Sequence, residues 1–273
     1  MMMNILLTLD KNYLLPMRVL LTSLFLNHPG ERFHIYIIGD GLEEVDLPRC
    51  LCDRFGAKLT LLSVDDSLFS SAPTLRYYSR AMYYRLLAAQ LLPQELDRIL
   101  YLDPDMLITG PLHNLYHTDM GESLFAACIH KGLVDLSTPV NRVRLHTQEA
   151  EGYFNSGMLL MNLPEMRKRI CPQAIFDYVS SNAALLVLPD QDVLNALYAE
   201  HIIQLDERLY NYDARKYSEY FVASKKLCDM AWVMENTRIL HFCGKRKPWK
   251  KTVTGRFLAL YRHYMALERL YGQ

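Results

Sequence analysis

The chain has 273 residues, of which 51% are hydrophobic, so its length and composition allow a full core and exclude a disordered chain. Lys and Arg together number 30, as do Asp and Glu, so no net charge favours nucleic acid or a membrane surface as a partner. The six scattered cysteines show no Cys-x-x-Cys pair of a zinc site. With no charged and apolar leader ahead of the first strand, we expect a cytoplasmic chain with reduced thiols.

Short apolar runs alternate with helical patterns through the first hundred residues. The apolar run at 4–9 predicts a strand buried on both faces, and apolar positions at helical spacing follow it until Asn27-His-Pro-Gly30 ends the helix. Alternation of strand and helix is the signature of a parallel sheet with crossover helices. The predicted strands are 4–9, 33–38, 58–62 and 98–102, and the predicted helices are 14–27, 42–55 and 79–92.

The second half of the chain predicts two more strands and then a mainly helical region. We expect strands at 124–128 and 156–161, and between them a polar stretch at 131–152 that covers the crevice as a flexible loop. The apolar run 183–188 is far shorter than a membrane span and is predicted to be a core element. The remaining predicted elements are helices at 164–181, 191–198 and 257–271 and a strand at 238–240.

The most informative phrase is Tyr-Leu-Asp-Pro-Asp-Met-Leu-Ile at 101–108. It sets Asp103 and Asp105 two positions apart after a predicted strand, and residues i and i+2 of an extended backbone point to the same side. Two carboxylates at one point are costly without a cation, and open α/β sheets bind ligands beyond the carboxyl ends of their strands. The phrase therefore predicts a metal site at a nucleotide crevice. The alternative is an ordinary turn, because Pro104 fixes its own backbone and Asp side chains cap nearby N–H groups.

Two further phrases put polar residues beside predicted apolar elements. Asn155-Ser-Gly157 precedes a strand, and glycine there lets a ligand approach the backbone amides, although the same phrase is an ordinary turn signal. Asp190-Gln-Asp192 opens a helix, where capping alone explains one acid. Capping does not require three polar side chains together, so this cluster indicates a site.

A third phrase, His241-Phe-Cys-Gly-Lys-Arg-Lys-Pro-Trp249, follows the predicted strand 238–240. A lone His after a strand is usually structural, but here a glycine turn and three cations follow it, which suits a diphosphate. With Asp103 and Asp105, His241 would make a ligand set of two carboxylates and one imidazole. Mg²⁺ prefers oxygen ligands and Mn²⁺ accepts nitrogen more readily, so we expect Mn²⁺, with Mg²⁺ as the alternative.

These phrases, in this order and spacing, resemble glycosyltransferase family 8, the family of glycogenin and of bacterial lipopolysaccharide galactosyl- and glucosyltransferases. The phrases Leu9-Asp-Lys-Asn-Tyr13 and Tyr83-Tyr-Arg-Leu86 add to the resemblance, which spans roughly residues 4–250. It implies a single Rossmann-like nucleotide-sugar-binding domain of the glycosyltransferase A type. It also implies a UDP-sugar donor, Mn²⁺, and retention of configuration at the anomeric carbon of the transferred hexose.

The resemblance implies roles for single residues. Asp103, Asp105 and His241 look like the metal ligands. The other implied donor-binding residues are Thr8, Asp10, Asn12 and Tyr13 around the uridine, with Tyr13 stacking on the base, then Arg85, Pro104, Asn155, Ser156, Asp190 and Gln191 around the donor sugar, and Gly244 and Lys247 as the diphosphate clamp.

Two departures from the family pattern bear on specificity. The family's galactosyltransferases tend to carry an acidic residue where this chain has His130, so the resemblance leaves open whether galactose or glucose is transferred. The loop after the first strand reads Leu9-Asp-Lys rather than a tandem acidic pair, so the pattern for uracil recognition does not carry over in full.

Retention requires either a covalent intermediate or attack from the face that the leaving group departs from. We expect front-face attack, with the departing diphosphate as base for the acceptor hydroxyl and Gln191 supporting the oxocarbenium-like centre. Asp190 is the only acid outside the metal pair that the motifs place near the sugar, so a covalent route through it stays open. The expected acceptor is a glycan, a lipid-linked glycan or a lipopolysaccharide.

The chain shows no internal repeat and no linker, so we expect one domain over 1–250 and a basic amphipathic helix within 251–273. From 245 to 273, four Lys and four Arg face one acid, Glu268, which gives 8 − 1 = +7. This composition suits an interfacial helix on anionic lipid at the inner membrane face. It suits equally a helix that packs on its own domain with a solvated basic face, and both interpretations stay open.

Two other functions are compatible with an α/β fold and a metal. A sugar-nucleotide nucleotidyltransferase would need a glycine-rich basic loop after the first strand, and residues 9–16 contain no glycine. The second alternative is a non-catalytic nucleotide-sugar-binding protein. The joint presence of metal, phosphate and sugar-side residues argues against it.

Overall fold

The computed structural model describes residues 2–39, 41–64, 69, 72–73, 81–129, 141, 144–145 and 152–272. His130 and most of the predicted loop 131–152 lie outside the described residues.

A seven-stranded sheet in the order β3-β2-β1-β4-β7-β6-β8 forms the centre of the molecule. The strands β3, β2, β1 and β4 run parallel, β7 runs antiparallel to both β4 and β6, and β8 is parallel to β6. The predicted mixed and mostly parallel sheet is therefore confirmed. The strands are β1 (Met2–Leu9), β2 (Arg32–Gly39), β3 (Lys58–Leu61), β4 (Arg98–Leu102), β6 (Phe125–Cys128), β7 (Met158–Asn162) and β8 (Ile202–Leu205).

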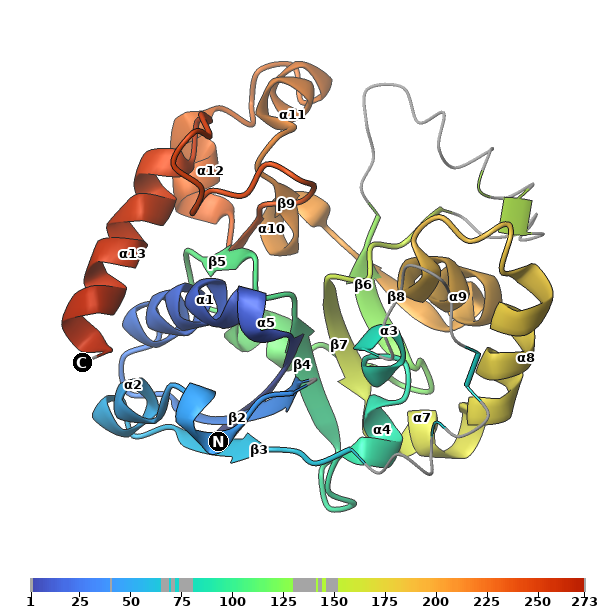
Figure 1. The fold of residues 1–273 in the computed structure, drawn as a ribbon. Coiled ribbons are helices and arrows are strands. Elements are labelled where there is room, and N and C mark those ends of the chain that lie inside the picture. Colours follow the sequence, from blue (N-terminus) through green and yellow to red (C-terminus); the bar gives the residue numbers. More distant parts are fainter. Residues whose placement is uncertain are drawn as a thin grey trace.

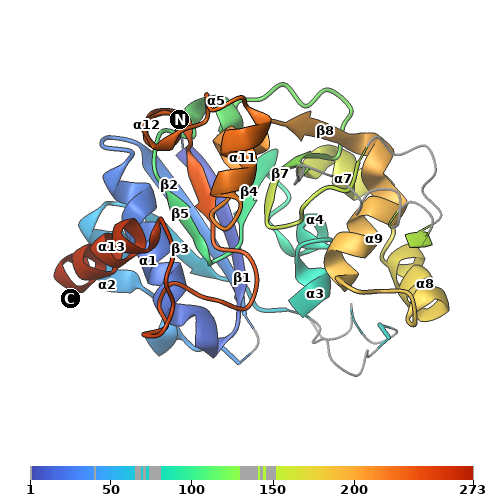
Figure 2. The same cartoon turned by 90° about the horizontal axis from the view of Figure 1, so that it is seen from above.

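Helices cover both faces of this sheet (Figures 1 and 2). Because side chains alternate along a strand, Ile5 and Leu7 of β1 pack into one core and Leu6 packs into the other. The first core lies under α1, α2 and α5, and the second lies under α3, α4, α7, α8 and α9. These helices are α1 (Leu14–Leu26), α2 (Arg49–Arg54), α3 (Ala81–Tyr84), α4 (Ala88–Leu91), α5 (His113–Tyr116), α7 (Leu163–Arg169), α8 (Pro172–Asn182) and α9 (Pro189–Tyr198).

A three-stranded sheet in the order β5-β10-β9 stands beside the large one and has its own small core. Its strands are β5 (Met106–Ile108), β9 (Tyr212–Asp213) and β10 (Ile239–His241). Strand β5 starts directly after Asp105, so the small sheet joins the late part of the chain to the end of β4. Three short helices surround it, α10 (Glu207–Tyr210), α11 (Tyr217–Ala223) and α12 (Met230–Asn236).

Three predicted helices are interrupted. Within 42–55, Leu47 is extended ahead of Pro48, and within 164–181 the chain is extended just before Pro172, because proline disfavours a helical residue in front of it. A 3-10 turn (Glu44–Asp46) and α2 replace the first helix, and α7 and α8 replace the second. The predicted helix 79–92 is divided into α3 and α4 at Arg85, whose side chain is bound by residues of other elements.

The prediction that 183–188 is a core element is wrong. Leu185 is 40% exposed, Val187 61% and Leu188 50%, and Leu186 is partly buried against the core, so most of the run faces solvent. The segment connects α8 to α9 instead, and its backbone is held by polar contacts, since the N–H groups of Val187 and Leu188 donate to Asp192. Apolar content alone did not decide burial here.

The C-terminal helix α13 (Leu258–Tyr271) packs against α1. Tyr261 is fully buried in the small core, the buried Glu268 carboxylate lies 2.5 Å from Nε of Arg18, and the Tyr264 hydroxyl accepts a hydrogen bond from Nδ2 of Asn27. The interpretation of a helix packed on its own domain therefore holds for this face of α13. Among the described residues, no helix is both long and apolar enough to span a membrane.

Candidate active site

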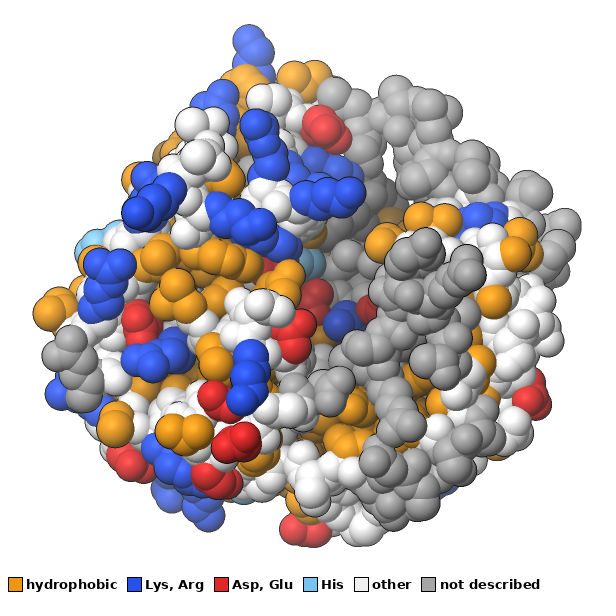
Figure 3. All heavy atoms as spheres, viewed as in Figure 1, with side chains coloured by type: hydrophobic (Ala, Val, Ile, Leu, Met, Phe, Trp, Pro, Cys, Tyr) orange, Lys and Arg blue, Asp and Glu red, His pale blue; other side chains and the backbone are white. Residues whose placement is uncertain are grey.

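The candidate site lies at the edge of the large sheet where β1 and β4 end and β7 begins. Because β7 is antiparallel to β4, Leu102 pairs with Met158, and the segment before β7 meets the segment after β4. The N–H of Asp103 donates to the carbonyl of Gly157 at 2.7 Å. Figure 3 shows this edge as a hollow with acidic, basic and His side chains at its bottom. The residues predicted for the site thus lie beyond the carboxyl ends of β1 and β4.

Asp103 and Asp105 sit in a turn and still point to one place. The N–H of Met106 donates to the Asp103 carbonyl at 3.3 Å, which closes the turn around Pro104. Oδ2 of Asp103 lies 3.9 Å, and Oδ1 of Asp105 3.3 Å, from Nε2 of His241. The turn and the metal site were alternatives in the sequence, yet the same segment, residues 103–106, forms the turn and carries both predicted carboxylate ligands.

His241 reaches the two carboxylates through the register of the small sheet. β10 pairs antiparallel with β5 so that His241 lies opposite Met106, and the N–H of Phe242 donates to the Asp105 carbonyl at 3.0 Å. One ligand atom from each of Asp103, Asp105 and His241 lies within 4.8 Å of the others. The three predicted metal ligands are therefore brought together, although His241 lies more than 130 residues from the two aspartates in sequence.

Burial and charge move the two carboxylates in opposite directions. Burial, helped by the neighbouring Asp105, raises the pKa of Asp103 above its ordinary value against the opposing pull of Arg85. Burial also acts to raise the pKa of Asp105, but His241 and Lys247 outweigh it and lower that pKa. Of the two carboxylates, Asp105 is therefore the one held more strongly in its charged form.

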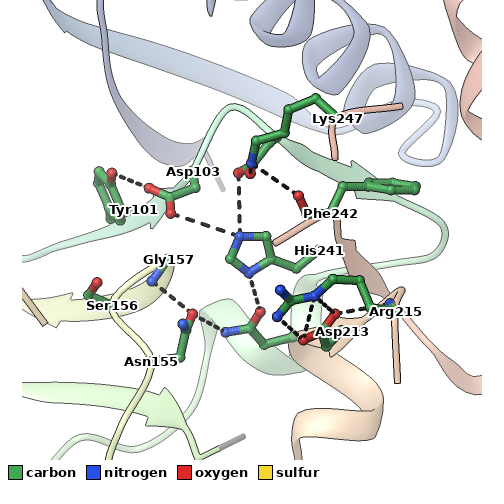
Figure 4. A network of polar contacts seen from close by, with 12 residues as sticks. Tyr101, Asp103, Asn155, Ser156, Gly157, Asp213, Arg215, His241, Phe242 and Lys247 are labelled. Carbon is green, nitrogen blue, oxygen red and sulfur yellow. Dashed lines mark hydrogen bonds and ion pairs between the residues drawn. The ribbon is translucent and has the colours of Figure 1, made fainter. Parts of the chain in front are cut away.

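Gly157 leaves the space into which these groups point. A Cβ on this residue would lie 2.6 Å from Cε1 of His241 and 2.8 Å from Oδ2 of Asp103, which is closer than carbon atoms approach without displacement. The close approach at Gly157 is by the side chains of two predicted metal ligands, and the approach of a bound ligand to the backbone amides stays a prediction. Figure 4 shows Gly157 facing them.

A chain of side-chain amides connects His241 to Gln191 and fixes the orientation of each amide. The N–H of Gly157 donates to Asn155 at 3.0 Å, so the accepting atom must be the Asn155 carbonyl oxygen. The Asn211 atom that lies 2.9 Å from the same oxygen is therefore its NH₂ group, and its carbonyl oxygen faces Nδ1 of His241 at 2.8 Å. Nδ1 must carry a proton, so Nε2 is the nitrogen left to face the carboxylates and a cation.

The other end of the same chain holds Gln191. Nδ2 of Asn155 donates to Oε1 of Gln191 at 3.0 Å, and the N–H of Ser156 donates to the same oxygen at 3.3 Å. Gln191 is buried, and its carbonyl dipole is fixed by two donors. The predicted sugar-side residues Asn155, Ser156 and Gln191 are brought together.

Arg85 lies between the metal-ligand pair and Asp190. Its Nη2 lies 3.2 Å from Oδ1 of Asp103, and its Nη1 lies 2.9 Å from Oδ2 of Asp190, which also accepts from the Ser156 hydroxyl at 2.9 Å. The guanidinium stacks over the ring of Tyr101 at 4.7 Å. Its Nε is buried with no hydrogen-bond partner in the described part of the chain, which leaves one donor for a ligand.

Asp192 does not belong to this group, although it is adjacent in sequence. It is fully buried and turned away, and it accepts from Arg144, from the Tyr153 hydroxyl at 2.5 Å and from two backbone N–H groups. Burial acts to raise its pKa, but these donors outweigh it and lower the pKa. Of the three polar residues 190–192, the first two face the site and the third anchors the helix start.

The predicted phosphate clamp lies on the far side of Asp105. The Lys247 ammonium contacts Oδ2 of Asp105 and donates to the Phe242 carbonyl at 3.1 Å. Gly244 has a φ of +80°, and a Cβ there would lie 2.6 Å from the Arg215 guanidinium. Lys247 therefore lies next to the predicted metal ligands, and Gly244 lies against Arg215.

The predicted uridine residues occupy the end of β1 and the turn after it. Thr8 is buried with its hydroxyl 3.1 Å from that of Tyr101, and Asp10 accepts from the N–H of Asn12 at 2.8 Å. The half-buried ring of Tyr13 meets Trp249 edge to face at 5.8 Å. Asp10 and Asn12 are exposed, so they form an open rim rather than a closed pocket.

Two residues of the cluster were missed in the sequence. The Tyr101 hydroxyl donates to Oδ1 of Asp103 at 2.6 Å, and burial raises its pKa well above the ordinary value, so the proton stays on the phenol. Strand alternation from Asp103 identifies Tyr101 as the residue on the same side, so a signal existed. Asn211 lies in an irregular segment between α10 and β9 and carries no such signal.

The sequence profile of glycosyl transferase family 8 matches residues 4–253 of the chain. Among similar proteins, a lipopolysaccharide 1,2-glucosyltransferase of Escherichia coli is 28% identical over 88% of this chain and 71% of its own length. The general stress protein A of Bacillus subtilis is 26% identical over 97% of this chain and 93% of its own. A lipopolysaccharide 1,3-galactosyltransferase of Salmonella typhimurium is 25% identical over 90% of this chain and 72% of its own.

The fold agrees with solved structures. The galactosyltransferase LgtC in complex with donor and acceptor sugar analogs superimposes with a TM-score of 0.78, covering 97% of this chain and 96% of that one at 22% identity. At this identity the likeness shows the fold alone, which is the glycosyltransferase A type. With the profile match over nearly the whole chain, it leads to one conclusion: the chain belongs to glycosyl transferase family 8 and is a glycosyltransferase.

Proposed function

We propose that this protein transfers a hexose, glucose or galactose, from a UDP-sugar to a carbohydrate acceptor with retention at the anomeric carbon and with a divalent cation. The observation that carries the proposal is the convergence of Asp103, Asp105 and His241, flanked by Lys247 and Arg85, at the sheet edge. A dicarboxylate site between two cationic side chains suits a metal that bridges a diphosphate. Relatives named as lipopolysaccharide glucosyl- and galactosyltransferases support the hexose and the glycan acceptor.

The residues present fit a divalent cation. The amide chain leaves Nε2 of His241 facing two carboxylates, and the missing Cβ of Gly157 keeps the space between them open. Two oxygens and one nitrogen favour Mn²⁺, with Mg²⁺ as the alternative. When bound, the cation neutralises the negative charge that develops on the departing diphosphate.

The donor would lie across the ends of β1 and β4. Tyr13 would stack on the uracil, with Thr8, Asp10 and Asn12 at the rim of the nucleoside pocket. Lys247 and the backbone of the Gly244 loop would bind the phosphates. The buried, unpartnered Nε of Arg85 offers one further donor to a sugar or phosphate oxygen.

In the proposed step, the bond between the anomeric carbon and the diphosphate oxygen breaks, and a bond to the acceptor oxygen forms on the same face. The acceptor proton passes to the departing diphosphate oxygen, so charge and atoms balance. Gln191 would support the oxocarbenium-like centre through its fixed carbonyl dipole. Oδ2 of Asp190 is engaged by Arg85 and Ser156, which weakens it as a nucleophile and supports front-face attack over the covalent route.

The test is slow hydrolysis of a panel of UDP-sugars in the presence of Mn²⁺, measured as UDP release. Hydrolysis needs no acceptor, so it reports both turnover and donor identity. We expect one UDP-hexose to be hydrolysed faster than the others and the rate to vanish with a chelator. If no UDP is released from any UDP-sugar, the proposal is wrong and a non-catalytic binding protein is favoured. Equal hydrolysis rates with and without chelator would show that the reaction does not need a metal.

A second, smaller part of the proposal concerns location. The exposed side of α13 carries cations such as Arg262 and Arg269, which would attract anionic lipid. We propose a cytoplasmic protein that contacts the membrane surface through this side. Co-sedimentation with anionic liposomes, compared with an Arg262→Gln, Arg269→Gln variant, tests it. If both proteins bind the liposomes equally, the proposed membrane contact through this side of α13 is wrong.

A further inference from the structure

A cavity of about 410 Å³ opens between α11, the end of β10 and the segment that leads into α13. It is distinct from the donor side, which lies across the ends of β1 and β4. Its volume is in the range that accommodates a small ligand. The lining residues are Ala214, Arg215, Tyr217, Ser218, Phe242, Cys243, Lys245, Arg246, Pro248, Val253, Thr254, Gly255, Arg256, Phe257 and Leu258.

The cavity is strongly cationic. Four of its lining residues are Lys or Arg and none is acidic. Arg215 is held against the wall by Asp213, with Nη2 and Oδ2 2.6 Å apart. In the described part of the chain, no carboxylate pairs with Lys245, Arg246 or Arg256, so three positive charges face one space without a counterion from the protein.

The floor of the cavity is aromatic. Tyr217, Phe242 and Phe257 line it, and the guanidinium of Arg256 stacks over the Tyr217 ring at 4.3 Å. Ser218 and Thr254 add hydroxyl groups at the wall. Aromatic faces beside charged and hydroxyl donors suit a sugar that carries a negatively charged group, because the ring packs on the aromatic surface and the anion binds the guanidinium groups.

The cavity adjoins the donor site through one short loop. Cys243 lines it and follows the predicted metal ligand His241 by two residues. The Arg215 guanidinium sits where a side chain on Gly244 would be, so the glycine of the proposed diphosphate clamp also lets the cavity wall approach. In Figure 3, Lys and Arg side chains gather along the upper rim of the hollow, on the side of α11.

We propose that this cavity binds a phosphorylated sugar of the acceptor and thereby holds an anionic glycan next to the donor. The inference rests on the proposed function and narrows its acceptor to glycans that carry phosphate. Phosphate is the group of choice because three cations without protein counterions converge there, and bidentate guanidinium binding favours it.

The probe is glucose 6-phosphate, with glucose as the matched neutral sugar, titrated calorimetrically into the full chain in the presence of a chelator. The chelator removes metal-bound phosphate at the donor site, where Lys247 and Arg85 remain, and the cavity variants distinguish binding in the cavity from binding to those two side chains. We expect glucose 6-phosphate to bind and glucose to give no heat. The variant Arg246→Gln, Arg256→Gln should weaken binding of glucose 6-phosphate at least tenfold, and the variant Lys58→Gln, Arg269→Gln, which removes the same charge from exposed positions elsewhere, should not.

Hydrolysis of a UDP-sugar, measured on the same proteins, separates this proposal from the proposed function. The single variant Arg256→Gln should keep the hydrolysis rate of the wild-type protein, since Arg256 lies outside the proposed diphosphate clamp. If the wild-type protein hydrolyses a UDP-sugar but binds glucose 6-phosphate no more tightly than the cavity variant does, the cavity proposal is wrong and the proposed function stands. Binding to anionic vesicles that depends on Arg246 and Arg256, with no affinity for glucose 6-phosphate, would assign the phosphate to a lipid headgroup and also overturn it.

Discussion

This protein has two pairs of aspartates with the same spacing, Asp103 with Asp105 and Asp190 with Asp192. The side chains of the first pair point to one place, and those of the second pair point apart. The first pair follows a strand and converges on His241. The second pair opens a helix, where residues two apart point about 200° away from each other. Asp190 therefore faces Arg85 at the site, and Asp192 is buried behind it against Arg144. A spacing of two has no meaning for function until the backbone conformation is known.

The largest expected effect is on the first pair. Replacing Asp105 with Ala removes the carboxylate that is held more strongly in its charged form and leaves Lys247 without its carboxylate partner. We expect UDP-sugar hydrolysis to fall by about a thousandfold or more, as loss of a main electrostatic group does. The matched control is Asp53→Ala on the exposed side of α2, which should hydrolyse at the wild-type rate. A normal rate for Asp105→Ala would disprove the site assignment.

In the second pair, we expect replacement of Asp192 to lower stability and replacement of Asp190 to lower activity. Asp192→Asn removes a fully buried carboxylate and leaves the partly buried Arg144 without its counterion, so we expect the free energy of unfolding, measured with urea, to fall by about 3 kcal/mol. Asp190→Asn lies partly in solvent and should change stability by less than about 1 kcal/mol, while hydrolysis falls at least tenfold. The reverse outcome, an Asp192→Asn protein that is stable but inactive, would show that Asp192 acts in the active site.

Gly157→Ala tests whether the first pair needs the open space in front of it. The added Cβ would meet His241 and Asp103, so these side chains must move apart. We expect the affinity for Mn²⁺, titrated by electron paramagnetic resonance, to fall on the order of tenfold to a hundredfold, comparable with the loss of a supporting contact. Gly255→Ala, where no atom lies near the added Cβ, is the control. Unchanged affinity in Gly157→Ala would place the cation elsewhere.

Asn211→Ala tests the orientation of the imidazole. Without the Asn211 carbonyl, Nδ1 of His241 loses its acceptor at 2.8 Å, and the tautomer that offers Nε2 is no longer favoured. We expect about tenfold weaker Mn²⁺ binding and a change in the ¹⁵N shifts of the His241 ring. Asn236→Ala, which removes a side-chain amide that bonds to the Trp232 carbonyl, is the matched control and should leave the shifts unchanged. Identical shifts in the wild-type and Ala proteins would refute the role of Asn211.

The smallest expected effect is the dependence of stability on acid. The folded-state pKa of Asp192 lies below its unfolded value near 3.9, so its contribution is fully present above about pH 5 and is lost as the pH falls through the folded-state pKa. Urea unfolding at about pH 6 and pH 3 should therefore show a steeper loss for the wild-type protein than for Asp192→Asn. Parallel losses would mean that Asp192 does not hold its charge in the fold.

Much of the fold follows from local pattern. The apolar runs of β1, β2 and β4 and the turn after α1 were predicted within one or two residues of their positions, because a doubly covered strand needs an unbroken apolar run. The predictions of continuous helices failed where a proline, such as Pro48, or a cation bound by other elements, such as Arg85, interrupts the helix. The exposed run 183–188 shows that apolar content by itself does not determine burial.

The sequence by itself determined which residue types gather at the end of β4, since the alternation of a strand and the chemistry of two carboxylates are local properties. The tertiary structure decided the rest. Only the pairing of β10 with β5 brings His241 to Asp105, and only the antiparallel β7 brings Gly157 to Asp103. Contacts between residues so distant in the chain depend on strand order and register, which no local spacing encodes.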